Sequence, residues 1–374
     1  MAGIYIHIPF CKQKCSYCDF HFSTTFHKYR AEMIESICKE IICRKDYLAN
    51  QVVETVYFGG GTPSLLTKDE FEQVLNSIKT TFNLSADLEF TVEANPDDIN
   101  KNTLQDWKQI GVNRLSIGLQ SFREEDLRWM NRAHNRSEAL NCVSLAQEEG
   151  FDNLSVDLIY GLPNLSTQDW KKNIQHVIDM KVPHVSAYCL TVEEKTSLHQ
   201  MVKNNKIKPA SEDEQSDQFN LLIDTLAENG MEQYEISNFS KLGKHSIHNS
   251  NYWTGKHYLG IGPSAHSFNG TSRSWNISNN QQYIKKVANN EKWDEIEILS
   301  KENQFNELLM TGLRTKFGVD TKKLKKIFPF PIKFQTTLSQ FIDNSWITED
   351  GSNIRLTQEG KLKADFIASE LFVL

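Results

Sequence analysis

The chain lacks three features that would place it in a membrane, outside the cell or on a polyanion. No run of about 18 apolar residues could cross a bilayer, and no N-terminal apolar stretch resembles a signal peptide. Acidic residues outnumber basic ones by 48 to 41, and the net charge of -7 disfavours nucleic acid as a partner. The seven cysteines, an odd number, do not suggest a disulfide framework. These absences predict a soluble cytoplasmic protein with no transmembrane segment.

Three of the cysteines form a C-x-x-x-C-x-x-C motif, at Cys11, Cys15 and Cys18, directly after a strand-like run and Pro9. No fourth cysteine lies nearby in the sequence. Because a 4Fe-4S cluster normally takes four thiolates, a loop with three predicts a cluster that has one iron open to another ligand. Two other interpretations remain: a zinc knuckle that lacks a ligand, and three cysteines buried for packing alone. A structural zinc site usually has a second ligand pair, which the nearby histidines do not form.

Up to about residue 236, short β-branched runs alternate with longer stretches of helical period. The expected strands are 3–8, 53–58, 87–94, 113–119, 153–158 and 184–189. The expected helices are 30–44, 68–82, 103–110, 137–149, 168–180 and 212–228. These strand–helix units predict a parallel sheet with right-handed crossovers, either an open doubly wound sheet or a curved partial barrel. Both architectures put ligand sites at the carboxyl ends of the strands.

Residues that could carry chemistry follow the expected strands one after another. After the cysteine loop they are the run GGGTP at 59–63, then Glu93 with Asn95, Gln120, Asp157 and Tyr188. Because glycine has no Cβ, this run would let the backbone approach a ligand closely, although a simple turn is the other interpretation. Glu93 and Asp157 could accept hydrogen bonds from an amine or a hydroxyl, and Arg132 could pair with a carboxylate. A solvated strand end is the alternative for Glu93.

After residue 236 the alternation stops. Residues 237–300 are rich in Asn, Ser, Gly and His, include the run HNSNYW at 248–253, and are expected to form a connecting segment. From 301 the pattern is helical again, and a turn at 349–353 predicts a small hairpin between helices. The expected domains are therefore 1–236, 237–300 and 301–374, the last a winged-helix-like α+β module. Its lysines at 322, 323, 325 and 326 could face nucleic acid, but a solvated helix face suits this acidic chain better.

Seven segments of the chain resemble one known family: IHIPFCKQKCSYCDF, VYFGGGTPSLL, FTVEANPDD, NRLSIGLQSF, VDLIYGLP, YEISNF and HNSNYWTGKHYLGIGPSAHSF. They span residues 4–268 and are similar to the oxygen-independent coproporphyrinogen oxidase family of radical S-adenosylmethionine proteins, and within it to the HemW branch of haem chaperones. The C-terminal module also resembles that of the family. The resemblance implies a partial (β/α)6 barrel of TIM type, with a 4Fe-4S cluster and S-adenosylmethionine as cofactors.

The resemblance also implies a role for each motif position. Cys11, Cys15 and Cys18 would bind the cluster, whose open iron would take the amino and carboxylate groups of S-adenosylmethionine. One electron from the cluster would cleave a sulfur–carbon bond of this cofactor, which the protein orients and shields. The residues expected around S-adenosylmethionine are Tyr5, Tyr17, Gly60, Gly61, Thr62 and Glu93. In the oxidase branch the positions of Gln120, Arg132 and Asp157 contact a second S-adenosylmethionine, and their presence permits such a site here.

Two departures distinguish the chain from the oxidase branch. That branch has a further cysteine where this chain has Phe20, and a longer segment ahead of the cysteine loop, whereas ten residues precede Cys11 here. The run at 248–253 is a mark of the HemW branch. The resemblance thus implies haem binding and delivery to an acceptor, with oxidative decarboxylation of coproporphyrinogen III as the alternative. His248 is the candidate axial ligand of haem, and a hydrogen-bonded loop histidine is the other interpretation.

The partners that the resemblance implies are haem, an acceptor protein such as a respiratory protein, and an electron donor such as flavodoxin or ferredoxin. Peripheral contact with a membrane is compatible with such an acceptor. Whether S-adenosylmethionine would be cleaved or only bound stays open.

Overall fold

The computed structural model of the protein describes residues 1–373. Its main sheet has 12 strands in the order β12-β11-β10-β9-β1-β2-β3-β4-β5-β6-β8-β7, and a 3-stranded sheet has the order β13-β15-β14. Among the described residues, no helix combines the length and the apolar character that crossing a bilayer requires.

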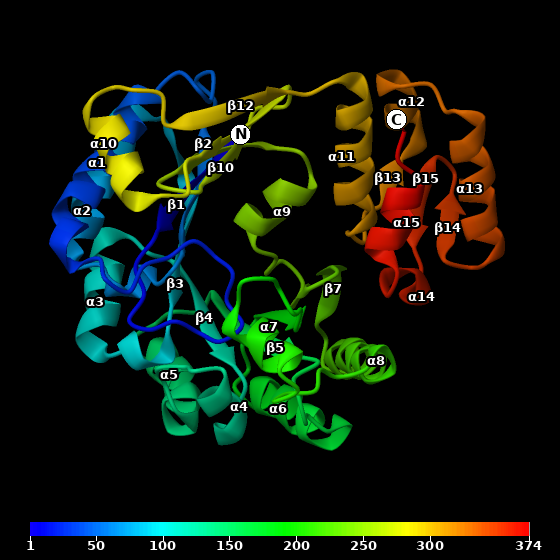
Figure 1. Cartoon of the computed structure of the whole chain (residues 1–374), viewed down its shortest axis with the longest axis horizontal. Coiled ribbons are helices and arrows are strands. Elements are labelled where there is room, and N and C mark those ends of the chain that lie inside the picture. Colours follow the sequence, from blue (N-terminus) through cyan, green and yellow to red (C-terminus); the bar gives the residue numbers. More distant parts are fainter. Residues whose placement is uncertain (374) are drawn as a thin grey trace.

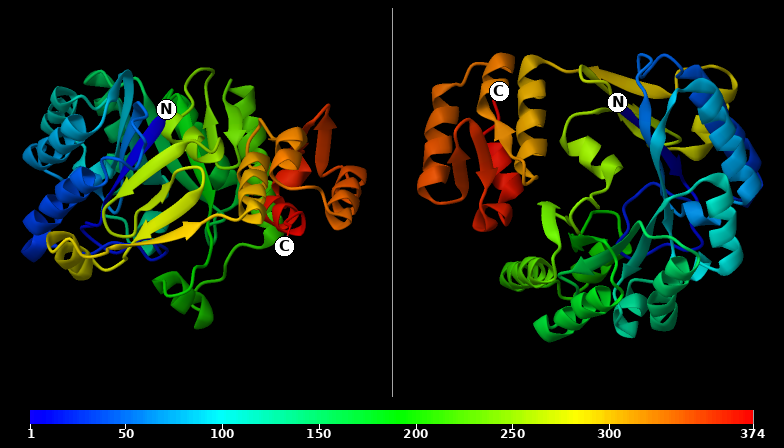
Figure 2. Two further views of the ribbon diagram at one scale, coloured as in Figure 1. Left: turned by 90° about the horizontal axis from the view of Figure 1, so that it is seen from above. Right: turned by 180° about the vertical axis from the view of Figure 1, so that it is seen from behind.

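The centre of the main sheet consists of the parallel strands that the sequence predicts. They are β1 (Ala2–Ile8), β2 (Val53–Gly60), β3 (Leu84–Ala94), β4 (Arg114–Gln120), β5 (Leu154–Tyr160) and β6 (His184–Cys189). The predicted helices are present as α1 (Arg30–Cys43), α2 (Lys68–Thr81), α3 (Lys101–Ile110), α5 (Arg136–Glu148), α6 (Thr167–Asp179) and α8 (Glu212–Glu228). These helices cover the outer face of a curved sheet (Figures 1 and 2), which is the predicted α/β partial barrel.

Alternation along the strands gives the barrel an apolar outer face and a polar interior. Ile4, Ile6 and Ile8 of β1 belong to the buried core, and the inward positions of β2 to β6 are polar. These positions hold Thr55, Tyr57, Glu89, Thr91, Glu93, Arg114, Ser116, Ser155, Asp157, His184 and Ser186. Bulky branched side chains usually fill the interior of a closed TIM barrel. The polar interior of this open barrel is instead suited to hold polar ligands or water.

Residues 232–300 extend the main sheet on both sides, which the sequence does not predict. The first added strand lies within the expected barrel domain 1–236. The added elements are β7 (Glu232–Glu235), β8 (Asn238–Ser240), α9 (Ile247–Trp253), β9 (His257–Ile261), β10 (His266–Phe268), β11 (Ser272–Asn276), α10 (Asn280–Ala288) and β12 (Asp294–Ile298). Strand β9 pairs with β1 in parallel, so β1 lies inside the sheet. The added strands have only three to five residues each, so they have little periodic signal. Helix α9 lies on the inner side of the curved sheet (Figure 2).

The C-terminal module has its own hydrophobic core, built around Phe305, Leu309 and Ile354. It contains α11 (Lys301–Leu313), β13 (Val319–Asp320), α12 (Thr321–Ile327), α13 (Ile332–Asp343), β14 (Ile347–Asp350), β15 (Asn353–Leu356), α14 (Gln358–Lys361) and α15 (Ala364–Glu370). The antiparallel pair β14 and β15 is the hairpin that the turn at 349–353 predicts. In Figure 1 the module lies to one side of the barrel, and α11 is its helix nearest to the barrel.

Candidate cofactor site

The three cysteines of the motif line one cavity of about 410 Å³ at the carboxyl ends of the parallel strands. They lie in the loop after β1, and none of them forms a disulfide. Backbone hydrogen bonds fix this loop: Cys11 N donates to Ser23 O at 3.1 Å, and Ser16 N donates to Met130 O at 2.9 Å. The second bond ties the loop to the segment that follows the short helix α4 (Glu124–Trp129). The loop therefore has a defined shape that holds the thiols toward the cavity.

Two polar side chains contact the thiols. The hydroxyl of Thr62 donates to Cys11 Sγ at 3.4 Å, and Arg132 Nη1 donates to Cys15 Sγ at 3.5 Å. Burial raises the pKa of the Cys11 thiol to about 11 and that of Cys18 to about 12, so without a bound metal both thiols are protonated at neutral pH. Metal binding must therefore displace these protons, so the affinity for metal is expected to rise with pH.

The cysteine geometry fits a cluster better than a single ion. Within residues 1–373, no three His, Cys, Asp or Glu side chains converge closely enough to hold one metal ion. A zinc ion would need such convergence, because its bonds to sulfur are only about 2.3 Å long. A 4Fe-4S cluster presents a separate iron to each thiolate, so three sulfurs spread along one wall suit it.

The glycine run at the end of β2 forms the next wall of the cavity. Gly60 has a φ of +105°, and a Cβ there would lie 2.5 Å from His7 Nδ1. A Cβ on Gly61 would lie 2.6 Å from the carbonyl oxygen of Phe10. The run is therefore required for its own packing against β1 and the start of the cysteine loop, in addition to any approach of a ligand.

Glu93 closes β3 beside the glycine run. Its Oε1 accepts a hydrogen bond from the hydroxyl of Tyr57 at 2.8 Å, and its Oε2 accepts one from Gly60 N at 3.2 Å. Burial, with a further contribution from the charge of Asp157, raises the pKa of Glu93 to about 7, although the Tyr57 bond acts in the opposite direction. The carboxylate thus faces the cavity with lone pairs available for an amine or a hydroxyl of a ligand.

The opposite wall holds the remaining predicted residues of this cavity, Tyr17, Gln120, Arg132 and Asp157. Arg132 Nη2 donates to Asn95 Oδ1 at 2.8 Å and to the carbonyl of Gly118 at 2.9 Å. Because the same guanidinium reaches Cys15, it links the cysteine loop to β3 and β4. Asp157 accepts a hydrogen bond from Ser116 at 3.3 Å, and burial raises its pKa to about 6.

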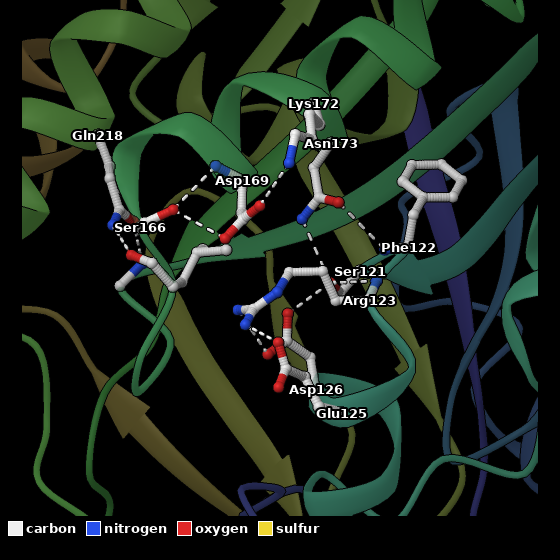
Figure 3. A network of polar contacts seen from close by, with 12 residues as sticks. Ser121, Phe122, Arg123, Glu125, Asp126, Ser166, Asp169, Lys172, Asn173 and Gln218 are labelled. Carbon is white, nitrogen blue, oxygen red and sulfur yellow. Dashed lines mark hydrogen bonds and ion pairs between the residues drawn. The ribbon is translucent and has the colours of Figure 1, made fainter.

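A network beneath Gln120 fixes the turn after β4 (Figure 3). Ser121 donates to Asp126 at 2.7 Å, and Asn173 of α6 donates to Ser121 at 3.2 Å and accepts from Phe122 N at 3.3 Å. Gln120 itself has a φ of +67°, a conformation that costs a non-glycine residue of the order of 1 kcal/mol or more. The buried network holds this turn, so Gln120 stays directed at the cavity.

Tyr5 and His248, two further predicted residues, do not line this cavity. Both border a second, inner cavity of about 180 Å³. His248 lies on α9, is 3% exposed, and has a hydrogen-bond partner at each ring nitrogen. Its Nδ1 lies 2.7 Å from Thr55 Oγ1, and its Nε2 lies 2.9 Å from the hydroxyl of Tyr252. Tyr5 was expected to contact S-adenosylmethionine. Its ring instead packs against Gly59, so closely that a Cβ on Gly59 would touch it.

The sequence analysis placed Asn95 with Glu93 at the end of the third strand, but it missed Tyr57 and Arg114, which the structure places at the inner cavity. Asn95 lines the cofactor cavity, and Tyr57 and Arg114 line the inner one. Strand parity could have found Arg114, because it shares a face of β4 with Ser116, Gly118 and Gln120. Arg114 lies at the amino end of β4, whereas the sequence analysis expected ligand-binding residues at the carboxyl ends of the strands.

Family comparisons agree with this geometry. The Radical SAM superfamily matches residues 5–177, and the HemN C-terminal domain matches residues 299–362. The structure of coproporphyrinogen III oxidase (HemN) from Escherichia coli matches with a TM-score of 0.85 and 22% identity, and covers 100% of this chain and 90% of that chain. At this identity the match shows the fold. The class is therefore a radical S-adenosylmethionine fold joined to a HemN-type C-terminal domain.

Curated relatives identify the family. The haem chaperone HemW of Bacillus subtilis (strain 168) is 32% identical over 97% of both chains. The haem chaperone HemW of Lactococcus lactis subsp. lactis (strain IL1403) is 32% identical over 95% of this chain and 93% of its own. The Escherichia coli (strain K12) protein of that name is 35% identical over 71% of this chain and 69% of its own. The chain belongs to the HemW haem chaperone family.

Proposed function

We propose that this protein is a haem chaperone that binds haem, a 4Fe-4S cluster and S-adenosylmethionine, and passes haem to an acceptor protein. The main support for cluster and S-adenosylmethionine binding is that one cavity is lined by Cys11, Cys15, Cys18, the glycine run and Glu93. The names of the curated relatives support the haem part. An electron donor and a haem acceptor, such as flavodoxin and a respiratory protein, belong to the same proposal.

Each residue of the cavity has a defined task in this proposal. When bound, the cluster would supply one-electron chemistry to S-adenosylmethionine. Thr62 and Arg132 orient the thiols of Cys11 and Cys15 through the hydrogen bonds described above. Glu93, held by Tyr57 and Gly60, accepts hydrogen bonds from the amine or ribose of S-adenosylmethionine. Tyr17, a partly buried residue of the cysteine loop, lies near Arg132 and shields that side of the cavity from water.

Haem binding is assigned to the region of α9. His248 is the proposed axial ligand, and each of its ring nitrogens has a hydrogen-bond partner. Ligation therefore requires His248 to exchange its bond to Tyr252 or to Thr55 for the bond to iron. The backbone amides of Ile247 and His248 donate to the buried carboxylate of Glu89 at 3.0 and 2.9 Å. This anchor keeps the start of α9 in place while a side-chain bond is exchanged.

Oxidative decarboxylation of coproporphyrinogen III is the second candidate. Gln120, Arg132 and Asp157 line the same cavity as the cysteines, so the residues that would hold a second S-adenosylmethionine are together. Against this function stands Phe20, which is 69% exposed and lines the cavity where the oxidase branch has a further cysteine. We therefore favour the chaperone.

Anaerobic reconstitution followed by two parallel assays tests the proposal. We expect a Soret band when haem is added, transfer of that haem to an apo-acceptor, and no turnover of coproporphyrinogen III with reductant and S-adenosylmethionine supplied. Decarboxylation at an enzymatic rate without measurable haem binding would establish the oxidase instead.

A further inference from the structure

The inner cavity continues from the cofactor cavity into the interior of the barrel. It has a volume of about 180 Å³, and shares Glu93, Ser116, Asp157 and Tyr188 with the cofactor cavity. Its other walls come from β1, β2, β4, β6, β8 and α9. A group that enters past Ser116 would reach Arg114 two residues further along β4, a distance of about 7 Å.

Arg114 is a buried cation that forms no ion pair with an acidic side chain in the described part of the chain. Its side chain lines the inner cavity and the residue is 2% exposed. Its Nε has no hydrogen-bond partner among the described residues. Glu93 and Asp157 are affected by the charge of Arg114 but form no hydrogen bond with it. A guanidinium that is buried without partners is costly, so this position calls for an anion or for water.

The two acids in the cavity are already engaged elsewhere. Glu93 accepts from Tyr57 and from Gly60 N, and Asp157 accepts from Ser116. The histidines at the cavity do not compete as cations, because burial lowers the pKa of His184 well below its usual value and that of His248 to about 3. Arg114 is thus the one permanent cation among the residues that line this cavity.

The chemistry of the ligand follows from the guanidinium and the volume. A guanidinium offers a planar fork of donors that matches the two oxygens of a carboxylate. The cavity is too small for a tetrapyrrole ring, so only a carboxylate on a short methylene stem would enter it. His248 borders the same cavity, so its ligation of haem iron would in addition require α9 to move away from the cavity.

We propose that the inner cavity is a carboxylate-binding site built on Arg114, and that a propionate of haem supplies the carboxylate. The site itself rests on the cavity and on the unpartnered guanidinium. The assignment to haem rests on the proposed function. A free small carboxylate is the other source of the same chemistry.

The test compares Arg114→Gln and Arg114→Lys with the unchanged chain, all full length and anaerobically reconstituted. Arg128→Gln is the matched control, because Arg128 has an exposed side chain on α4. Haem and its dimethyl ester, in which both propionates are esterified, are titrated into each protein. In a separate arm, sodium propionate is added and the melting temperature is compared with that in sodium chloride of equal ionic strength.

We expect the unchanged chain and Arg128→Gln to bind haem about tenfold or more tightly than the ester, as for a charged hydrogen bond. Arg114→Gln should bind both about equally, and Arg114→Lys should keep part of the preference. Propionate should raise the melting temperature of the unchanged chain but not of Arg114→Gln. If Arg114→Gln does not fold, a reduced preference in Arg114→Lys supports the site and an unchanged preference counts against it.

The outcomes separate this inference from the proposed function. Haem binding that is equal for haem and ester, together with no effect of propionate, overturns the carboxylate site and leaves the chaperone standing. A propionate effect that depends on Arg114, with equal binding of haem and ester, supports the site but assigns it to a free carboxylate. If the unchanged chain binds neither haem nor ester, the proposed function fails, and the propionate arm alone decides about Arg114.

Discussion

The ring of Tyr57 stacks on the imidazole of His248, with centroids 4.8 Å apart and planes inclined by 22°. The hydroxyl of the same tyrosine donates to Glu93 at 2.8 Å. A candidate S-adenosylmethionine residue and the candidate haem ligand therefore share one neighbour on β2. A change at Glu93 could therefore affect His248 of α9 through the side chain of Tyr57, which contacts both residues.

Tyr57→Phe keeps the stack and removes only the hydrogen bond to Glu93. Because that bond lowers the pKa of Glu93, the pKa should rise further in the variant. A lost hydrogen bond to a charged group costs about 1.5–3 kcal/mol, so binding of S-adenosylmethionine should weaken about tenfold or more at pH 7.5. Equilibrium binding to the reconstituted protein measures this. Tyr258→Phe, which loses a tyrosine bond to Arg273 instead, should bind as the unchanged chain does.

Glu93 should make the stability of the cofactor-free protein depend on pH. Its pKa is raised from 4.5 to about 7 in the folded state, so between these values the folded state binds more protons than the unfolded state. Stability should therefore fall as pH rises through this range, by at most about 3 kcal/mol. Glu93→Gln should remove much of this fall and be more stable than the unchanged chain at pH 8. Asp157, whose pKa is raised to about 6, should leave a smaller slope at lower pH.

Urea denaturation at pH 5, 6.5 and 8 checks this expectation, with the exposed Glu72→Gln as the control. Equal slopes for Glu93→Gln and for the unchanged chain would mean that Glu93 is ionised with an ordinary pKa in the folded protein.

Gly60 and Gly111 form a matched pair for testing the glycine run. Both have a positive φ, +105° and +98°, so alanine is strained at either position. Only at Gly60 does a Cβ meet other atoms, with His7 Nδ1 at 2.5 Å, because nothing lies within 4 Å at Gly111. Gly60→Ala should therefore destabilise the protein by about 1–3 kcal/mol more than Gly111→Ala. Thermal or urea melts of the two variants measure the difference, and equal losses would contradict the packing role.

The sequence predicts the cofactor cavity well because its residues follow one rule. Cys11, Gly60 and Glu93 each lie at the end of a parallel strand or directly after it, and parallel strands end at the same edge of a sheet. Asp157 was expected at the end of its strand but lies in the middle of β5, which continues to Tyr160. The surroundings of His248 could not be predicted in this way. The face that α9 presents depends on the pairing of β9 with β1, a contact between segments about 250 residues apart that no local pattern encodes.

The role of Arg114 was hidden for a related reason. An arginine at the amino end of a strand normally reaches solvent, so its residue type gives no sign of burial. Arg114 borders the same inner cavity as residues of α9, and the sequence analysis expected a connecting segment in place of that helix.

The cysteine motif gives a direct test of cluster binding. Reconstituted protein should hold about four irons and four sulfides per chain, and Cys15→Ala should lose most of them because one of three thiolates is removed. Cys142→Ala is the control, since Cys142 lies on α5 with its side chain buried in the core, and this variant should keep the full content. Iron and sulfide analysis decides the outcome. A full cluster in Cys15→Ala, or preferential filling by zinc, would refute the assignment.

The hydrogen bonds of His248 allow its role in haem binding to be separated from its role in packing. His248→Ala should weaken haem binding and change the Soret band, because loss of an axial ligand changes the field at the iron. Tyr252→Phe removes the partner of Nε2 and leaves the imidazole in place. If Nε2 ligates iron, Tyr252→Phe should keep the Soret band and bind haem at least as tightly, because that nitrogen no longer has to exchange a bond. Thr55→Val makes the corresponding test for Nδ1. A Soret band and affinity unchanged in His248→Ala would show that the histidine serves packing and that another residue ligates haem.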